Sequence, residues 1–251
     1  MATLHEILGN SDYMLDLCVR MAHHSTAIEG NTITLAQTKS IIVDNYIPRE
    51  VKEREFYEVR NYRYLIPVLI ESLNTDEVIN NELIKRFHSV IMKDLHKEAG
   101  MFKMVENMII GADFESTKPY LVPTELKNWC DNLNYKLNNS RNLQEKLSAI
   151  FESHIQFEKI HPFSDGNGRT GRLLIVYSCF ENNLVPFVIP QDRKDFYLAC
   201  LAENRIKDLV KFGEELMKKE EARINLFLQQ NNTIENEVKF ENVIKHNKKR
   251  R

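Results

Sequence analysis

The sequence predicts a mainly α-helical bundle with one short β-hairpin, and three observations support this fold class. Only 8 Gly and 7 Pro occur among the 251 residues. Apolar residues recur at helical spacing over most of the chain. The hydrophobic content of 43% is enough for a sizeable core. Because glycine and proline interrupt regular structure, their scarcity and their clustering at a few places favour long helices between those places.

The first half of the chain contains four expected helical regions, at residues 4–29, from 34 onward, 52–73 and 80–95. Thr34 and Gln37 have the spacing of a capping box, which opens a helix. Pro67 lies inside the third region and is expected to kink it. The fourth region has apolar residues on one helix face, namely Leu83, Ile84, Phe87, Val90 and Ile91.

The character of the sequence changes in the middle of the chain. Residues 106–112 are β-prone around Ile109 and Ile110, and residues 118–122 follow after a polar turn. We therefore expect a short β-hairpin there. Helices are expected again after it, at residues 124–138, 143–160, 168–180 and 192–201.

Bulk properties exclude several classes of protein. The net charge of -2 gives no general attraction to nucleic acid or to an acidic membrane surface. The cysteines have no metal-ligand spacing and are expected to be buried thiols in a reducing compartment: Cys18, Cys130, Cys179 and Cys200. No signal-peptide pattern opens the sequence, and the most apolar run, residues 173–180, is too short to span a bilayer. We expect a cytoplasmic protein with neither a membrane nor a nucleic acid as partner.

One stretch, residues 161–172, concentrates groups that phosphate chemistry needs: His-Pro-Phe-Ser-Asp-Gly-Asn-Gly-Arg-Thr-Gly-Arg. A Gly-Asn-Gly turn can expose successive backbone N–H groups, because glycine tolerates positive φ and has no Cβ to block a ligand. A helix that starts there adds its own first N–H groups and its dipole. The stretch therefore predicts an anion-binding site.

Four side chains of the same stretch suit a phosphate site. Arg169 and Arg172 are three residues apart, so on a helix they project from the same side, and guanidinium forks match phosphate oxygens. Asp165 supplies a hard oxygen ligand of the kind that Mg²⁺ takes together with substrate phosphates. His161, with an ordinary pKa of about 6.5, can accept a proton at neutral pH.

These residues resemble the signature of the Fic family, His-Pro-Phe-x-Asp/Glu-Gly-Asn-Gly-Arg-x-x-Arg, with every fixed position present. Fic proteins are mostly AMP transferases, which move AMP from ATP to a Ser, Thr or Tyr hydroxyl of a protein and release pyrophosphate. The resemblance implies a Fic-type helical bundle whose hairpin is a flap beside the active site. It divides the chain into an N-terminal helical region with an inhibitory helix, a catalytic core, and a C-terminal helical extension with a basic tail, at residues 1–75, 76–213 and 214–251.

The resemblance also assigns roles to the signature residues. His161 would be the general base that takes the proton from the target hydroxyl. Asp165 would hold Mg²⁺, the expected cofactor, against the α- and β-phosphates of the co-substrate ATP. Phe163 would point into the core and fix the loop.

The remaining signature residues would bind the phosphates. Gly166, Asn167 and Gly168 would form the anion hole, with Asn167 at the α-phosphate. Arg169 would contact the β-phosphate and Arg172 the γ-phosphate. Gly168 favours nucleotidyl transfer, because a related subgroup has Lys at that place and transfers the γ-phosphoryl group instead.

A second match lies far upstream, where residues 25–31 read Ser-Thr-Ala-Ile-Glu-Gly-Asn and resemble the Fic inhibitory motif. Ser25 and Glu29 are four residues apart, which places them on one helix face. Gly30 suits the left-handed conformation just past a helix end. In the family this helix presents its Glu to the second signature arginine, which would pair Glu29 with Arg172 and restrain the enzyme. A plain helix end with a solvated Glu29 is the alternative.

Two further sets of residues carry expectations by family analogy. Met108, Ile109 and Ile110 would form the flap that pairs with an extended segment of the target protein, the alternative being a hairpin with no partner. Tyr197 is a candidate contact for the adenine base, the alternative being a packing residue.

The main expectation is a protein adenylyltransferase restrained by its own Glu29, with ATP and a protein substrate as partners. Self-modification is included, although the sequence does not choose the acceptor hydroxyl, and the oligomeric state is left open. One alternative is removal of AMP from a modified protein, with Glu29 positioning a water. Another is an ATP-responsive binding module without chemistry, against which the intact His161 and Asp165 argue.

Overall fold

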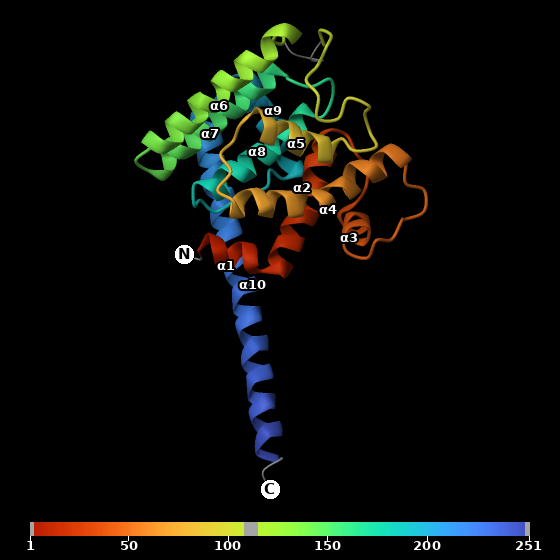
Figure 1. Ribbon diagram of the computed structural model, residues 1–251, viewed down its shortest axis with the longest axis vertical. Helices are drawn as coiled ribbons and strands as arrows, with labels where there is room; N and C mark the ends of the chain where they lie inside the picture. The colour runs from red at the N-terminus through yellow and green to blue at the C-terminus, as the bar shows by residue number, and fades with distance from the viewer. Residues whose placement is uncertain (1–2, 108–114, 249–251) are drawn as a thin grey trace.

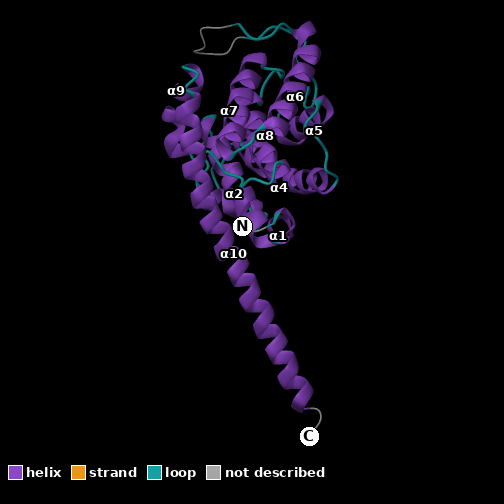
Figure 2. Cartoon of the chain, turned by 90° about the vertical axis from the view of Figure 1, so that its left-hand side faces the viewer, coloured by secondary structure: helices purple, strands orange, loops and turns teal. Residues whose placement is uncertain are grey.

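The computed structural model describes residues 3–107 and 115–248, with side chains as far as residue 230, and this part of the chain contains helices and no strands (Figure 2). Two short 3₁₀ turns, η1 (Pro119–Leu121) and η2 (Gln191–Arg193), accompany the α-helices. The α-helices are α1 (Leu4–Gly9), α2 (Ser11–Ile28), α3 (Leu35–Ile42), α4 (Glu53–Asn74), α5 (Asn81–Ile91), α6 (Val122–Asn139), α7 (Leu143–Ile160), α8 (Asn167–Glu181), α9 (Lys194–Ala202) and α10 (Ile206–Lys248).

Polar side chains fix the starts of several helices. Thr34 and Gln37 form the expected capping box at α3, with the Gln37 N–H donating to Thr34 Oγ1 at 3.3 Å. Asn10, Asn80 and Asn142 cap α2, α5 and α7 by accepting from N–H groups of the first turn. The helix boundaries therefore follow from local sequence as well as from packing.

Helix α8 forms the centre of the bundle. Nearly all of its side chains are buried, and it packs against α2, α4, α5 and α7 (Figure 1). Residues 173–180 of α8 are apolar on nearly all sides, and such a segment is buried among other helices. Because the signature stretch leads into α8, the candidate site lies at the N-terminal end of the most buried helix.

Two long helices frame this centre. α4 continues through Pro67, whose ring is exposed, so the proline takes no space in the core. α10 packs on α7, α9 and α2 and then extends away from the bundle (Figure 1). It runs without a break across residue 213, where we expect the catalytic core to end.

The expected hairpin is wrong in its second half. Residues 118–122 are not a strand but contain η1, which leads directly into α6. Pro119 and Pro123 explain the difference, since the ring of proline fixes φ near about −65° and suits the first turn of a helix. The expected flap residues Met108, Ile109 and Ile110 lie outside the described residues.

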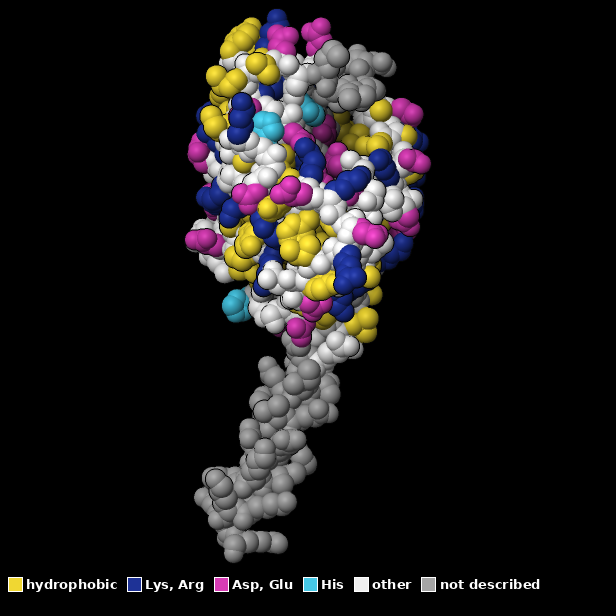
Figure 3. All heavy atoms as spheres, turned by 90° about the vertical axis from the view of Figure 1, so that its right-hand side faces the viewer, with side chains coloured by type: hydrophobic (Ala, Val, Ile, Leu, Met, Phe, Trp, Pro, Cys, Tyr) yellow, Lys and Arg dark blue, Asp and Glu magenta, His cyan; other side chains and the backbone are white. Residues whose placement is uncertain are grey.

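The burial of the cysteines and the charge of the surface are as the composition predicts. The four cysteines are buried and unpaired with one another. No helix within the described ranges combines the length and the apolar character needed to cross a membrane. Acidic and basic side chains are interspersed over the face that Figure 3 shows, in keeping with a net charge near zero.

Candidate active site

The signature loop joins α7 to α8 and has left-handed backbone at both ends. His161 follows the last residue of α7 with a φ of 50°, and Gly166 precedes α8 with a φ of 80°. A side chain at Gly166 would also meet the Met92 sulfur, at 2.6 Å from its Cβ. Glycine is therefore required at position 166 both for backbone conformation and for space.

His161 has the tautomer that a general base needs. Its ring Nδ1 lies 3.2 Å from the Glu158 carbonyl oxygen, which can only accept, so Nδ1 carries the proton and Nε2 is left as an acceptor. Burial lowers the pKa of His161 below its ordinary value of 6.5. The imidazole is therefore neutral and able to accept a proton at pH 7.

Asp165 is ionised and offers the carboxylate of the site. Its Oδ1 accepts from the Gly166 N–H at 2.6 Å and from Arg169 Nη2 at 3.1 Å, and its Oδ2 accepts from Arg54 Nη2 at 2.5 Å. Burial acts to raise the pKa of Asp165, but the nearby guanidinium of Arg169 and the hydrogen bond from Arg54 hold it below 3.8.

The donor set fits Mg²⁺ bound jointly with phosphates. Over the described ranges, no group of three or more His, Cys, Asp or Glu side chains is arranged to hold a metal ion by itself. The signature loop offers the carboxylate of Asp165 beside the start of α8, where backbone N–H groups lack acceptors within the helix. Mg²⁺ usually binds through one or two carboxylates together with substrate phosphates.

The Asn167 side chain fixes the loop rather than pointing at a ligand. Its Oδ1 accepts from the Phe163 N–H at 2.9 Å and its Nδ2 donates to the Phe163 carbonyl at 2.8 Å. Since α8 begins at Asn167, its first N–H groups have no acceptor within the helix. The anion hole expected from Gly166, Asn167 and Gly168 thus has backbone N–H groups to offer.

Arg172 is paired with both residues of the upstream motif, although 143 positions separate it from Glu29. Its Nη2 donates to Glu29 Oε1 at 2.6 Å and to the Ser25 carbonyl at 2.9 Å, and its Nε donates to Ser25 Oγ at 2.9 Å. Burial acts to raise the pKa of Glu29, but Arg172 holds it below 4.5. The structure therefore brings Ser25, Glu29 and Arg172 together as an ion pair with hydrogen bonds.

The Glu29 carboxylate also lies against the start of α8. A Cβ built on Gly168 would collide with Glu29 Oε1 and would lie 3.1 Å from Arg172 Nη1. Glu29 Oε1 therefore occupies the space next to the backbone of the expected anion hole that a side chain at position 168 would enter.

Arg169 is almost completely buried and keeps unused donors. Its side chain is 2% exposed, with Nη1 3.3 Å from Glu58 Oε1 and Nη2 on Asp165. Nε and Nη1 of Arg169 have no hydrogen-bond partner among the described residues. Buried donors without partners are rare in proteins, and here they are suited to phosphate oxygens.

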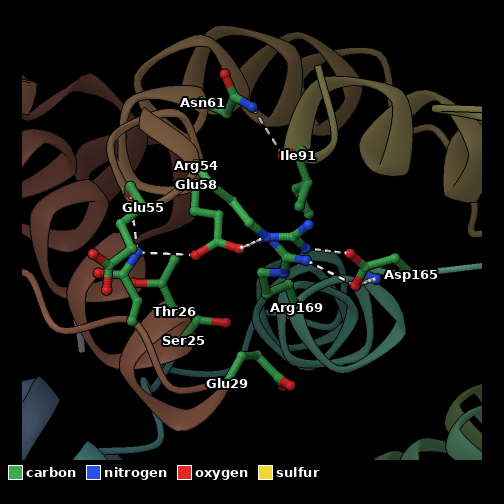
Figure 4. Close-up of polar contacts among 12 residues, drawn as sticks. Ser25, Thr26, Glu29, Arg54, Glu55, Glu58, Asn61, Ile91, Asp165 and Arg169 are labelled. Carbon is green, nitrogen blue, oxygen red and sulfur yellow. Dashed lines mark hydrogen bonds and ion pairs between the residues drawn. The ribbon is translucent and has the colours of Figure 1, made fainter. Parts of the chain in front are cut away.

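Arg54 and Glu58 are part of this site and were not expected from the sequence. Both come from α4, and Arg54 reaches between Glu58 and Asp165 (Figure 4). Asn31, the last residue of the upstream motif, donates to Glu58 Oε2 at 2.9 Å. The only sequence signal is the four-residue spacing of Arg54 and Glu58, which is common on solvated helices.

His88 holds the signature loop from α5 and was also missed. Its ring stacks on Phe163 with centroids 3.6 Å apart, and its Nδ1 accepts from the Gly100 N–H at 2.8 Å. Nε2 therefore carries the proton and donates to the Asp165 carbonyl at 2.9 Å. Burial lowers the pKa of His88 to about 4, so the ring is neutral.

Phe163 is buried, as expected for the residue that points into the core.

A further support comes from the segment after α5. The Lys103 N–H donates to the Pro162 carbonyl at 2.9 Å. Lys103 Nζ donates to Asn107 Oδ1 and to Ser116 Oγ, both at 2.8 Å, and Asn107 Nδ2 donates to the Phe163 carbonyl at 3.0 Å. Burial lowers the pKa of Lys103 to about 8. The segment therefore holds the signature loop at Pro162 and Phe163.

Tyr197 does not support the expected adenine contact. It has no exposed surface, and its hydroxyl is hydrogen-bonded to His154 Nε2 in the core. The arrangement is that of a packing residue beneath Arg172.

Comparison with known proteins connects this geometry to a family. Residues 78–179 match the sequence profile of the Fic/DOC family. The chain is 28% identical to protein adenylyltransferase fic-1 of Caenorhabditis elegans over 209 residues, which cover 82% of this chain and 40% of that protein. It is 30% identical to protein adenylyltransferase Fic of Nematostella vectensis over 184 residues, covering 70% of this chain and 40% of that protein. The chain thus spans about two fifths of the length of these curated relatives.

Solved structures share the fold. A Fic domain containing signaling protein from Bacteroides thetaiotaomicron matches with a TM-score of 0.74 at 19% identity, over 86% of this chain and 87% of that one. Fic-1 of C. elegans matches with a TM-score of 0.69 at 27% identity, over 86% of this chain and 63% of that one. Sequence profile, fold and signature loop agree that residues 78–179 form a domain of the Fic/DOC family.

Proposed function

We propose that the protein is an adenylyltransferase that transfers AMP from ATP to a Ser, Thr or Tyr hydroxyl of a protein. One observation carries the proposal. A neutral histidine, whose Nε2 has no hydrogen-bond partner among the described residues, stands in the same twelve-residue stretch as a helix start and two buried arginines. Such a transfer needs a general base and a site that binds the phosphates of ATP. The names of the relatives in C. elegans and N. vectensis support the same activity.

In the proposed reaction, the target hydroxyl oxygen attacks the α-phosphorus of ATP. His161 Nε2 takes the hydroxyl proton, the bond between the α-phosphorus and the bridging oxygen breaks, and pyrophosphate leaves. The N–H groups at the start of α8 stabilise charge on the α-phosphate, and Arg169 binds the β-phosphate. Asp165 would hold Mg²⁺, which neutralises phosphate charge when bound.

Glu29 restrains this reaction in the proposed scheme. It holds Arg172, the residue expected at the γ-phosphate, and it lies against Gly168. ATP must compete with a negative carboxylate for both places, which disfavours the pose for in-line attack. The protein substrate docks on the flap around Met108, Ile109 and Ile110, and the chain itself is included among the candidate substrates.

A transfer assay with two labels tests the proposal. ATP labelled at the α-phosphate or at the γ-phosphate is incubated with Mg²⁺ and with wild type, Glu29→Gly or His161→Ala, each alone and with cell lysate. Protein labelled only from the α-phosphate, with a stronger signal for Glu29→Gly and none for His161→Ala, is expected.

The other outcomes separate the alternatives. Label from the γ-phosphate alone would mean a kinase-like reaction. If no protein is labelled from either phosphate, the enzyme is next incubated with a protein that already carries AMP. Loss of its AMP would indicate de-AMPylation with Glu29 positioning the water, and nucleotide binding without any product would indicate a binding module.

A further inference from the structure

Four charged side chains from two distant segments form one cluster beside the signature loop (Figure 4). Arg54 Nε lies 3.2 Å from Glu58 Oε1, and Arg54 Nη2 lies 2.5 Å from Asp165 Oδ2. Arg169 Nη1 lies 3.3 Å from Glu58 Oε1, and Arg169 Nη2 lies 3.1 Å from Asp165 Oδ1. Two guanidinium groups thus share two carboxylates, and each guanidinium contacts both carboxylates.

The four members differ in freedom to move. The side chains of Arg169 and Glu58 are 2% and 10% exposed, whereas those of Asp165 and Arg54 are 37% and 58% exposed. Glu58 is fixed further by Asn31 Nδ2 at 2.9 Å. Arg54 is therefore the member that can leave its place at low cost, and Glu58 is the member that stays.

Charge balance decides what happens when a divalent cation reaches Asp165. The carboxylate of Asp165 now accepts from two guanidinium groups and from the Gly166 N–H, so both of its oxygens are occupied. A cation adds two positive charges at the place where Arg54 already contributes one. A cation at Oδ2 competes with Arg54 Nη2 for this oxygen, and Glu58 is the second carboxylate that the structure puts within reach of Arg54.

We propose that Arg54 and Glu58 set the affinity of Asp165 for a divalent cation, with Arg54 competing for the carboxylate and Glu58 receiving both arginines when the cation binds. This inference rests on the proposed function, which brings a cation and a nucleotide to Asp165. Arg54 and Glu58 are positioning residues, because each acts on Asp165 or Arg169 and neither is assigned a contact with the reacting atoms.

The competition has effects of opposite sign at the two positions. Removing the charge of Arg54 frees Asp165 Oδ2 and lowers the cation concentration needed for binding. Removing the charge of Glu58 leaves Asp165 as the only carboxylate in the cluster, so both arginines hold it more tightly and the required cation concentration rises. A residue with a merely structural role would weaken binding at either position.

The test measures ADP binding by isothermal titration calorimetry over a series of Mg²⁺ concentrations. All proteins carry Glu29→Gly, so that the inhibitory carboxylate does not block the nucleotide. The quantity compared is the Mg²⁺ concentration at which the affinity for ADP reaches half of its maximum. It is expected to fall about two- to fivefold for Arg54→Gln and to rise by a similar factor for Glu58→Gln. The factors are small because ion pairs of this exposure have modest strength. The double variant Arg54→Gln/Glu58→Gln is expected to lie between the two.

Two controls accompany the series. Arg54→Lys keeps a positive charge and should stay near the parent. Arg60→Gln removes a guanidinium from the same helix, where Arg60 pairs with Asp94 at 2.9 Å instead of with the cluster, and should not change the Mg²⁺ dependence.

The outcomes are unambiguous. Unchanged or higher Mg²⁺ requirement for Arg54→Gln overturns the inference, and because Arg54 is exposed this variant does not depend on refolding of the core. A shift of the same sign in both single variants overturns it too, as does Mg²⁺-independent ADP binding by the parent. Opposite shifts without any AMP transfer in the labelling assay would keep the inference and refute the proposed function.

Discussion

Glu29 Oε1 lies 2.6 Å from Arg172 Nη2, which joins the end of α2 to the first turns of α8 across 143 positions of sequence. Arg172 is 7% exposed, whereas the Glu29 side chain is 41% exposed. The contact therefore has one fixed partner in the core and one partner at the surface, which is the partner that a ligand can displace.

Replacing Glu29 should release the site. Glu29→Gly is expected to raise AMP transfer by roughly ten- to a hundredfold, because hydrogen bonds to charged groups contribute about 1.5–3 kcal/mol. Initial rates of α-phosphate labelling at fixed ATP measure the effect. Glu29→Gln is the matched variant, since it keeps the length of the side chain and loses its charge. Rates equal to wild type for both variants would remove the inhibitory role.

His161 should determine the acid limb of the pH profile. His161→Ala is expected to lower the rate by on the order of 10²–10⁴-fold, the usual contribution of a positioned base. The base acts when neutral, and burial lowers its pKa, so activity should persist below pH 6.5 and be lost as pH falls through the lowered value. The pH dependence of kcat/KM for Glu29→Gly measures this, and an acid midpoint at or above 6.5 would contradict the assignment.

Gly168 should tolerate a side chain only when Glu29 is absent. Gly168→Ala is expected to destabilise the wild type by about 1–3 kcal/mol, as overpacking does, because its Cβ meets Glu29 Oε1. In the Glu29→Gly background most of this cost should vanish. Thermal unfolding of the four proteins forms a double-mutant cycle. Additive losses would mean that Glu29 does not fill the space next to Gly168.

His88 should make the fold sensitive to acid. Its folded pKa of about 4 lies below the ordinary 6.5, so protons bind the unfolded chain more readily. The stability that depends on neutral His88 is complete above pH 6.5 and declines as pH falls toward 4, by a total of roughly 1–3 kcal/mol. Urea unfolding of wild type and His88→Gln at pH 7 and pH 5 measures it. The difference in unfolding free energy between the two proteins should shrink at pH 5, and a constant difference would refute this account.

The sequence predicts the parts of this site that are local. The twelve-residue signature, the capping box at Thr34 and the helix after the signature can all be identified from spacing and composition, because each depends on neighbours in the chain. The pairing of Glu29 with Arg172 could be expected only through the family resemblance, since no local signal links residues so far apart.

The parts that could not be predicted depend on packing between distant helices. Arg54, Glu58 and His88 look like ordinary residues of amphipathic helices, and only the approach of α4 and α5 to the loop gives them partners. The second strand of the hairpin was wrong for another reason: Pro119 favours a helical start over a strand, a local preference that β-prone neighbours concealed.

The bond from Arg172 Nη2 to the Ser25 carbonyl has a consequence for α2 itself. Ser25 lies in the last turn of α2, where carbonyl groups lack partners within the helix and carry the negative end of its dipole. Arg172 is thus a cationic C-terminal cap supplied by another helix. A phosphate that displaces Glu29 from Arg172 would remove one of the bonds that tie this turn to α8, so nucleotide binding is expected to loosen the turn. Amide hydrogen exchange at residues 25–31 would then report site occupancy directly, without a label on the nucleotide.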